Sequence, residues 1–312
     1  MNKIKTIFIV GPTASGKTSL SIDLAKKFSG EIICADSMQI YKGIHIASAA
    51  PDEEEKQGVP HHLFEFLDLD SRFSVADYVT LARKCIKDID GRKNIPIVVG
   101  GTGLYISSLL DNTQYHTENT DYELRKRLEE RFDKNSAEKM LSDLSEFDPQ
   151  TAARLHPNNR RRIIRAFEVY YLTGKTVTEL NALSHTAESE IEPLVIGITY
   201  ANREILYNRI NLRTDMMIEN GLEEEARQTL GLGSSTGAFQ AIGHKELYAY
   251  IKGECTLEDA AELLKRQTRR YAKRQLTWFK RDSRVNWIYA DTENIYERAH
   301  TLTREFLKEE HN

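Results

Sequence analysis

The most chemically explicit stretch of the sequence is GPTASGKT, residues 11–18, which fits the pattern G-x-x-x-x-G-K-[ST]. In such loops the backbone N–H groups and the start of the next helix converge on phosphate oxygens, the lysine reaches the outer phosphate, and the final hydroxyl coordinates Mg²⁺. We therefore predict that Lys17 contacts phosphate and that Thr18 holds the metal. The predicted loop consists of Gly11, Pro12, Thr13, Ala14, Ser15, Gly16, Lys17 and Thr18. The motif alone does not identify the compound that carries the phosphates.

A carboxylate opens the stretch DSMQIY, residues 36–41, which follows a second apolar run. Because the carboxyl ends of parallel strands line the ligand crevice, we expect Asp36 near the phosphate loop. Three roles remain open for it: a ligand of Mg²⁺, a general base, or the cap of a following helix. Gln39 adds an amide that can read the edge of a nucleobase, and Tyr41 adds a ring that can stack on one.

Two further groups are candidates for the same crevice. Residues 100–105 read GGTGLY; their glycines allow a ligand to approach the backbone and Thr102 offers a hydroxyl, unless the stretch is only a turn before a helix. Arg209 and Arg213 stand four residues apart on a predicted helix, so they can act together on an anion. The adjacent histidines at 61–62 point to opposite sides of an extended chain and are not expected to share a metal.

The elements that must position these groups alternate between strands and helices. Apolar β-branched runs predict strands at residues 4–10, 31–35, 95–99 and 194–198. Helical spacing of apolar side chains predicts helices at residues 18–28, 75–89, 203–221 and 256–280. Ser74 and Asp77 form a predicted capping box at the start of the second of these helices. The order of the elements indicates an α/β fold, a parallel sheet with flanking helices.

Between about residues 113 and 190 the strand pattern stops and charged helical patterns replace it. We expect a mostly helical insertion, and the length of 312 residues agrees with roughly two domains. The predicted organisation is a first core part at 1–115, the insertion at 116–190, and a second core part at 191–312 that ends with a basic helix.

Charge is unevenly distributed along the chain. The formal net charge is −4, yet residues 265–284 contain nine Lys or Arg and one Asp. Four cations of the predicted helix fall on one face, with Tyr271 and Trp278 as aromatic neighbours, a mixture typical of nucleic-acid binding. They are Arg266, Arg270, Lys273 and Arg274. A second run, with four arginines within residues 160–165, is explained equally well by a solvated helix face.

The cysteines, Cys34, Cys85 and Cys255, are far apart and form no C-x-x-C pair. We expect reduced thiols in the core, no structural zinc and a cytoplasmic location. The apolar run at the N-terminus is too short for a signal peptide, and no stretch is long and apolar enough to span a membrane. We also expect a monomer.

Taken together, the motifs resemble those of one family, the tRNA dimethylallyltransferases or tRNA isopentenyltransferases, of the bacterial type. The resemblance covers nearly the whole chain and rests on the order of the motifs, because few of them are diagnostic singly. They read GPTASGKT (11–18), DSMQIY (36–41), PHHL (60–63), GGTGLY (100–105), RRIIRAFEV with TGK (161–169 and 173–175), AIGHKE (241–246) and TRRYAKRQLTWF (268–279).

The resemblance implies a P-loop NTPase-like fold and transfer of a dimethylallyl group, with Mg²⁺. The donor would be dimethylallyl diphosphate and the acceptor the exocyclic amine of the adenine 3′ of the anticodon, in the anticodon stem-loop of tRNA. The phosphate loop would thus hold a prenyl diphosphate, although the motif is commonly labelled nucleotide-binding or ATP-binding. Lys17, Thr18, Arg209 and Arg213 would absorb the charge that grows on the leaving diphosphate, and Asp36 would accept the proton of the amine.

The resemblance also assigns contacts with tRNA. The flipped adenine would lie against residues 36–39 and Thr102, and the helical insertion would contact the anticodon arm. With the two arginines of the basic helix, the predicted tRNA-binding residues are Asp36, Ser37, Met38, Gln39, Thr102, Arg125, Arg161, Arg162, Ile163, Ile164, Arg165, Arg270 and Arg274.

Three positions depart from the family pattern. Ala50 replaces the lysine of G-T-A-K-P, residues 157–159 read PNN in place of P-N-D, and His244 replaces the tyrosine of A-I-G-Y-K-E. Lys42 is the nearest cation in sequence that would substitute for the missing lysine. Two alternatives remain: a P-loop small-molecule kinase, which leaves the basic helix unexplained, and a non-catalytic tRNA-binding relative, which agrees with the missing lysine.

Overall fold

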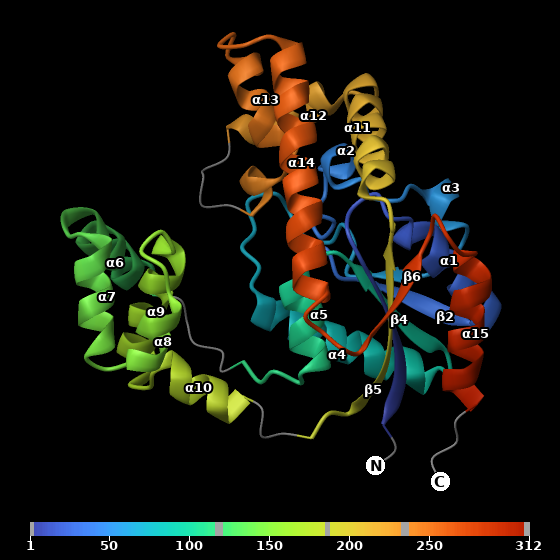
Figure 1. Ribbon diagram of the computed structural model, residues 1–312, viewed down its shortest axis with the longest axis horizontal. Helices are drawn as coiled ribbons and strands as arrows, with labels where there is room; N and C mark the ends of the chain where they lie inside the picture. Colours follow the sequence, from blue (N-terminus) through green and yellow to red (C-terminus); the bar gives the residue numbers. More distant parts are fainter. Residues whose placement is uncertain (1–2, 116–120, 185–187, 232–236, 309–312) are drawn as a thin grey trace. The chain divides into compact units, whose positions relative to one another are not determined.

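The structure is a computed structural model that describes residues 3–115, 121–184, 188–231 and 237–308 (Figure 1). The chain divides into two compact units. The first consists of Met1–Leu110 and Ser189–Asn312, and the second of Asp111–Glu188. The helical second unit is therefore inserted between two parts of the chain that fold together around a sheet.

The sheet has six parallel strands in the order β3-β2-β4-β1-β5-β6 within the described part of the chain. They are β1 (Ile4–Val10), β2 (Gly30–Cys34), β3 (His61–His62), β4 (Ile95–Gly100), β5 (Ile191–Thr199) and β6 (Val285–Tyr289). Strand β1 lies inside the sheet, where Ile7 pairs with Ile97 of β4 and with Leu194 of β5. The loop that follows β1 is therefore held from both sides.

The four predicted strands are confirmed as β1, β2, β4 and β5, and the two edge strands are additional. Strand β3 has only two residues, too few to produce a hydrophobic pattern. Strand β6 reads VNWIY, and only Ile288 within it is fully buried. Sequence patterns do not reveal such strands, because backbone hydrogen bonds to the neighbouring strand, and not a hydrophobic pattern of their own, hold them extended.

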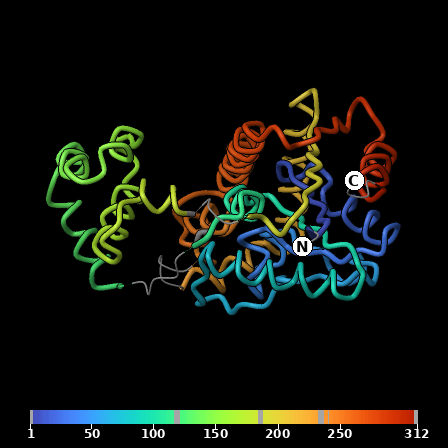
Figure 2. Tube along the Cα trace, turned by 90° about the horizontal axis from the view of Figure 1, so that it is seen from below, coloured from blue at the N-terminus to red at the C-terminus, as the bar shows by residue number. Residues whose placement is uncertain are grey.

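Helices cover both faces of the sheet. One face packs against α1 (Lys17–Phe28) and α15 (Ile295–Lys308), which lie side by side in Figures 1 and 2. The other face packs against α4 (Val75–Gly91), which is followed after β4 by α5 (Gly103–Leu110). Alternation along β1 explains both contacts, since Ile7 and Ile9 point to the first face and Phe8 to the second.

The predicted capping box of α4 is confirmed. The Ser74 hydroxyl accepts a hydrogen bond from the Asp77 backbone N–H at 3.2 Å, and the Asp77 carboxylate accepts one from the Ser74 N–H at 2.9 Å. These bonds satisfy donors that the first turn of a helix leaves without partners.

A group of helices stands beyond the carboxyl ends of the strands in Figure 1. It contains α11 (Arg203–Glu219), α12 (Leu222–Leu230), the 3₁₀ turn η1 (Ala238–Gln240), α13 (His244–Ile251) and α14 (Leu257–Phe279). Short helices α2 (His45–Ser48) and α3 (Glu53–Lys56) precede β3. Helix α14 buries Leu264 and Phe279 on one side, and its predicted basic face exposes Arg270 and Arg274.

The second unit is built from α6 (Tyr122–Lys134), α7 (Ala137–Ser145), α8 (Pro149–Arg154), α9 (Arg160–Thr173) and α10 (Val177–Ser184). Its core is formed by Leu128, Met140, Leu144, Ile163, Ile164 and Phe167, among others. Side chains of Asp121, Ser136 and Asp148 cap the first turns of α6, α7 and α8. Across the residues that the structure describes, every helix is too short or too polar to serve as a membrane span.

Candidate active site

The phosphate loop connects β1 to α1 in a conformation that its glycines make possible. Gly11 and Gly16 have φ values of 144° and 96°, which side chains disfavour, and a Cβ at Gly11 would collide with the carbonyl oxygen of Ile198. Within the loop, the Ser15 hydroxyl is buried and has no hydrogen-bond partner among the described residues. A loop that holds a helix N-terminus and an unsatisfied donor is suited to an anion.

Lys17 is the first residue of α1, and its ammonium group donates a hydrogen bond to the carbonyl oxygen of Pro12 at 2.7 Å. Burial lowers the pKa of Lys17 to about 8; the charge of Asp36 opposes this shift and that of Arg213 adds to it. The side chain is therefore still mostly charged at pH 7. The nearby Asp36 carboxylate does not fully neutralise the positive charge of Lys17, and the remaining charge favours an incoming phosphate.

The two arginines predicted to act as a pair both reach the phosphate loop from α11. Arg209 donates from Nε to the carbonyl oxygen of Ala14 at 3.0 Å, and Arg213 donates to the Thr13 hydroxyl at 3.4 Å. Arg209 is exposed and Arg213 is partly buried. Burial lowers the pKa of Arg213, and the nearby Asp36 carboxylate counteracts this. The helix thus places two cations against one loop.

Asp36 lies in the same cavity as Lys17, Thr18 and Arg213, a space of about 230 Å³. One carboxylate oxygen accepts a hydrogen bond from the Met38 backbone N–H at 2.9 Å. No helix starts there, because α2 begins only at residue 45. The helix-cap alternative is therefore wrong, and the roles of general base and metal ligand remain.

The glycine-rich stretch after β4 forms the wall beside Asp36. The Thr102 hydroxyl accepts a hydrogen bond from the Ser37 backbone N–H at 2.9 Å, and the Thr102 N–H donates to the carbonyl oxygen of Ala35 at 3.2 Å. A Cβ at Gly100 would collide with that same Ala35. Glycine is required here because β2 and β4 are paired, so the loop after β2 and the loop after β4 pass each other in direct contact.

Gln275 of α14 is a structural residue that sequence analysis misses. Its side-chain oxygen accepts a hydrogen bond from the Thr13 N–H at 2.9 Å, and its side-chain nitrogen donates to the carbonyl oxygen of Gly101 at 3.0 Å. The residue is 5% exposed. The available signal in the sequence was that Gln275 is an amide on the otherwise apolar, buried side of its helix. It ties the phosphate loop to the loop that carries Thr102.

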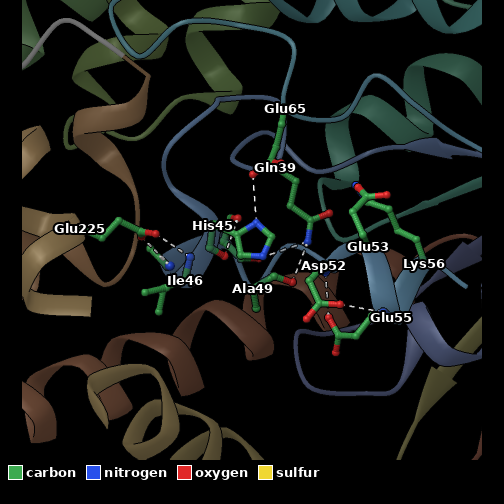
Figure 3. Close-up of polar contacts among 12 residues, drawn as sticks. Gln39, His45, Ile46, Ala49, Asp52, Glu53, Glu55, Lys56, Glu65 and Glu225 are labelled. Carbon is green, nitrogen blue, oxygen red and sulfur yellow. Dashed lines mark hydrogen bonds and ion pairs between the residues drawn. The ribbon is translucent and has the colours of Figure 1, made fainter. Parts of the chain in front are cut away.

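The proposed recognition role of Tyr41 does not fit the structure, whereas Gln39 lines the cavity with Asp36 but has its amide donors already in use. The Gln39 amide donates to the carbonyl oxygens of Ser48 and Ala49, each at 3.2 Å, so its donors already have partners (Figure 3). Tyr41 is 3% exposed and packs in a core cluster with Ile40. A ring enclosed by apolar side chains is not available to stack on a base, and the prediction for Tyr41 is wrong.

Helix α2, which forms part of the cavity wall, is held by the carboxylate of Glu225 (Figure 3). The backbone N–H groups of Ile46 and Ala47 donate to Glu225 at 2.6 and 2.8 Å. His244, which replaces the tyrosine of the family pattern, is fully buried and lies 2.7 Å from the same carboxylate. His244 therefore acts within a buried network behind the wall and does not line the cavity.

The missing lysine at Ala50 leaves a buried alanine beside a larger cavity of about 790 Å³. Lys26, Lys27 and Arg213 also line this space, which adjoins the phosphate loop at Thr18. Lys42 lines neither cavity; it forms an exposed ion pair with Asp68 at 3.1 Å. Lys42 is therefore not positioned to replace the lysine.

The adjacent histidines have structural partners. His62 lies 2.6 Å from the Glu31 carboxylate, and His61 lies 2.8 Å from the carbonyl oxygen of Val59. The described residues contain no group of three or more His, Cys, Asp or Glu side chains arranged for a metal. Cys34 is buried, which raises the pKa of its thiol, whereas Cys85 and Cys255 are only partly buried.

The predicted tRNA-binding residues of the second unit fall into two groups. Arg161, Arg162 and Arg165 of α9 are exposed, and Arg125 of α6 is partly exposed. Arg165 also pairs at 2.8 Å with the buried carboxylate of Glu168. By contrast, Ile163 and Ile164 are 0% and 2% exposed. The side chains of these two isoleucines belong to the core of the unit and are not accessible to tRNA.

Comparison with known proteins agrees with this arrangement. The family described as IPP transferase matches residues 39–282, and the family described as isopentenyl transferase matches residues 4–70. The chain is 42% identical to a tRNA dimethylallyltransferase of Caldanaerobacter subterraneus, over 97% of this chain and 98% of that protein. It is 47% identical to a tRNA dimethylallyltransferase of Acetivibrio thermocellus, over 91% of each chain.

Solved structures agree as well. A tRNA isopentenylpyrophosphate transferase from Bacillus halodurans is 41% identical, with a TM-score of 0.72 over 99% of this chain and 100% of that chain. A eukaryotic dimethylallyltransferase acting on tRNA is 31% identical, with a TM-score of 0.84 over 97% of this chain and 79% of that chain. The predicted α/β fold of the P-loop NTPase type is thereby confirmed. The chain belongs to the IPP transferase family, the tRNA dimethylallyltransferases that its motifs resemble.

Proposed function

We propose that this protein transfers a dimethylallyl group from dimethylallyl diphosphate to the exocyclic amine of the adenine 3′ of the anticodon in tRNA. The observation that carries the proposal is one cavity in which a phosphate loop and two positive side chains, Lys17 and Arg213, face a carboxylate, Asp36. A prenyl transfer needs both: cations for the leaving diphosphate and a base for the incoming amine.

On the diphosphate side, the bond between the allylic carbon and oxygen breaks and negative charge grows on the diphosphate. Lys17, the loop N–H groups and the pair Arg209 and Arg213 stabilise that charge. Their positive charges are fixed before the reaction, and Lys17 and Arg213 lie in a cavity partly shielded from water. The negative charge that develops on the diphosphate is therefore stabilised by donors that are already in position and need not reorganise.

On the amine side, a carbon–nitrogen bond forms and the nitrogen must lose a proton. Asp36 accepts it, because its second carboxylate oxygen is not used by the Met38 contact. The adenine has to leave its stack to reach the cavity. Ser37 and Met38 line the cavity where the flipped base would lie, and Thr102, which does not line it, holds Ser37 through its hydroxyl.

Mg²⁺ fits the oxygen ligands that line the cavity. Thr18, at the start of α1, offers a hydroxyl beside the phosphate loop, and diphosphate oxygens would complete most of the coordination. When bound, the ion neutralises charge on the leaving diphosphate. A site of one hydroxyl plus substrate oxygens is typical of Mg²⁺ bound with phosphates.

The proposed tRNA surface has two parts. In the first unit, α14 exposes Arg270 and Arg274; in the second, α9 exposes Arg161 and Arg162. Exposed arginines suit phosphate groups, and the helical unit supplies a second surface for the anticodon arm. We further propose that the protein acts as a monomer in the cytoplasm.

The test is one assay matrix on the purified protein. Dimethylallyl diphosphate or ATP is combined with tRNA or with free nucleosides, and the mass gained by each acceptor is measured. The proposal predicts a gain of one dimethylallyl group on tRNA only, dependent on the prenyl donor. Phosphate transferred from ATP to a nucleoside would indicate a kinase, and tRNA binding without any transfer would indicate a non-catalytic relative.

A further inference from the structure

Trp278, in the last turn of α14, is 40% exposed to solvent. Leu104, in the first turn of α5, is 47% exposed. Helices α5 and α14 pack on each other, and Figure 1 shows the end of α14 against α5. Tryptophan is usually buried or used in recognition, so an exposed one calls for a partner.

The indole ring is held in a fixed position. Its N–H donates a hydrogen bond to the Ser107 hydroxyl at 2.8 Å. A Cβ at Gly103 would lie only 2.5 Å from Cδ1 and 2.6 Å from Cγ of the ring. The five-membered ring therefore packs directly on the Gly103 backbone, which only glycine permits. A ring fixed in advance loses little entropy when a ligand stacks on it.

Trp278 extends a row of side chains that line the site. Tyr271, Gln275 and Trp278 follow each other at intervals of four and three residues on α14. Tyr271 lines the cavity with Asp36, and Gln275 binds Gly101. The helix rises by about 1.5 Å per residue, so Trp278 lies about 10 Å along the axis from Tyr271, and it does not line the cavity.

The surroundings favour a nucleic acid as the partner. Lys273, Arg274, Lys280 and Arg281, on or next to the end of α14, are exposed cations. An aromatic ring beside exposed cations is the combination that binds single-stranded nucleic acid, in which bases stack on rings while phosphates meet the charges. A separation of about 10 Å corresponds to roughly three stacked bases at about 3.4 Å each.

We propose that Trp278, with the exposed Leu104 of the adjoining helix α5, is a stacking platform for an unpaired base of the anticodon loop, close to the adenine that enters the cavity. The inference rests on the proposed function, since it takes tRNA as the substrate. It adds a recognition residue that reads an unstacked base outside the cavity, independently of the phosphate contacts of Arg270 and Arg274.

Fluorescence gives a direct test, because the chain has two tryptophans, Trp278 and Trp287. Trp287 belongs to β6, and its ring packs on Gly197, its pairing partner in β5. In the Trp287→Phe variant, Trp278 is the only tryptophan reporter. Stacking predicts saturable quenching by an anticodon stem-loop RNA and little quenching by a blunt RNA duplex of equal length. Equal quenching by both, or none by the stem-loop, would overturn the proposal.

Affinity measurements complete the test. Trp278→Ala should weaken tRNA binding by about 5- to 100-fold, and Trp278→Phe by less, since loss of base–aromatic stacking has effects of this size. The slope of log affinity against log salt should stay unchanged, because no charge is removed. Tyr289→Ala, at the exposed end of β6, is the matched control and should bind like the wild type. Thermal unfolding checks that each variant is folded, and Leu104→Ala, with a smaller loss of affinity, replaces Trp278→Ala if that variant unfolds.

The outcomes separate the two proposals. If the wild type binds and modifies tRNA but Trp278→Ala and Leu104→Ala bind equally well, the platform is wrong and the proposed function stands. If the wild type neither binds tRNA nor transfers a prenyl group, the function itself is wrong, and the platform fails with it.

Discussion

The cavity and the exposed surface of α14 use positive charge in different ways. Lys17 and Arg213 are partly buried, each has a defined hydrogen bond to the phosphate loop, and both face one carboxylate. Arg270 and Arg274 are exposed on a helix. Charges interact strongly where water is excluded and weakly where salt screens them. Single changes in the cavity should therefore affect the chemical step greatly, whereas single changes on the surface should affect binding slightly.

The largest effect is expected for Asp36→Asn. The amide keeps the size of the side chain and can still accept from Met38, but it cannot take up a proton. Single-turnover transfer should fall by about 10² to 10⁴ while both substrates still bind. If Mg²⁺ affinity collapses instead and excess metal restores the rate, Asp36 is a metal ligand and its role as base is wrong.

Lys17→Ala should lower the chemical rate by about 10² to 10³, because one fixed donor to the leaving diphosphate is lost, and should leave tRNA affinity nearly unchanged. The pKa of about 8 adds a pH signature. In the free protein Lys17 loses its proton as the pH rises through about 8, so kcat/KM for the diphosphate should decline above that pH. This alkaline decline should be absent in the variant. An equal loss of tRNA binding in a filter assay would contradict the assignment.

Glu31→Gln separates a structural buried carboxylate from the chemical one. Glu31 is 4% exposed and accepts hydrogen bonds from Arg92 at 2.7 Å and Asn94 at 2.7 Å, and these, against an opposing effect of burial, lower its pKa from 4.5 to about 2. The folded state thus prefers the ionised form, and this stabilisation is present above pH 4.5 and lost as the pH falls towards 2. The variant should lose about 3 kcal/mol of unfolding free energy at pH 7.

Urea unfolding at pH 7 and near pH 3 measures that difference, which should shrink at the lower pH. The matched control is Glu53→Gln on α3. The Glu53 side chain is 90% exposed, so although its partner Lys56 is only 14% exposed, the change should alter stability by less than about 0.5 kcal/mol. If Glu31→Gln lowers the transfer rate of folded protein at pH 7 as strongly as Asp36→Asn does, the separation between structural and chemical carboxylates fails.

The smallest effects are expected on the surface. Replacing Arg270 and Arg274 by Gln should weaken tRNA binding and reduce the slope of log affinity against log salt by about 0.7 to 0.9 for each phosphate contact removed. Lys84→Gln, an exposed cation on α4, serves as the control. An unchanged slope in the double variant would show that the two arginines form only a solvated helix face.

The parts of the site that sequence analysis predicts are those encoded by local patterns. The phosphate loop, Asp36 and the pair Arg209 and Arg213 each follow from a short motif or a helical interval. The structure brings residues of the loop, Asp36 and Arg213 to one cavity, and Arg209 binds the loop at Ala14 without lining that cavity. The bridge made by Gln275 is not local, because its two partners are Thr13 and Gly101, far away in the sequence. Helical periodicity places Gln275 on the buried side but does not name what it meets there.

The wrong expectations have a common physical cause. Tyr41 follows a strand near the site, and its position in sequence does not distinguish a ring in the crevice from a ring in the core; packing with Ile40 decides the matter. Ile163 and Ile164 lie in a segment whose arginines are exposed, yet the helical period turns these two side chains inward. Whether a side chain is buried depends on the folded chain. A short motif indicates burial only where its apolar residues recur at the period of a helix or strand.

The division between cavity and surface is tested most directly by salt. The single-turnover rate at saturating tRNA and the tRNA dissociation constant would be measured in the wild type at about 50 and about 200 mM salt. Affinity should fall at least about tenfold, as expected for several exposed phosphate contacts, while the rate at saturation should change less than about twofold. A saturated rate that falls in parallel with the affinity would contradict the account, because the charges that drive chemistry would then be as exposed as those that bind tRNA.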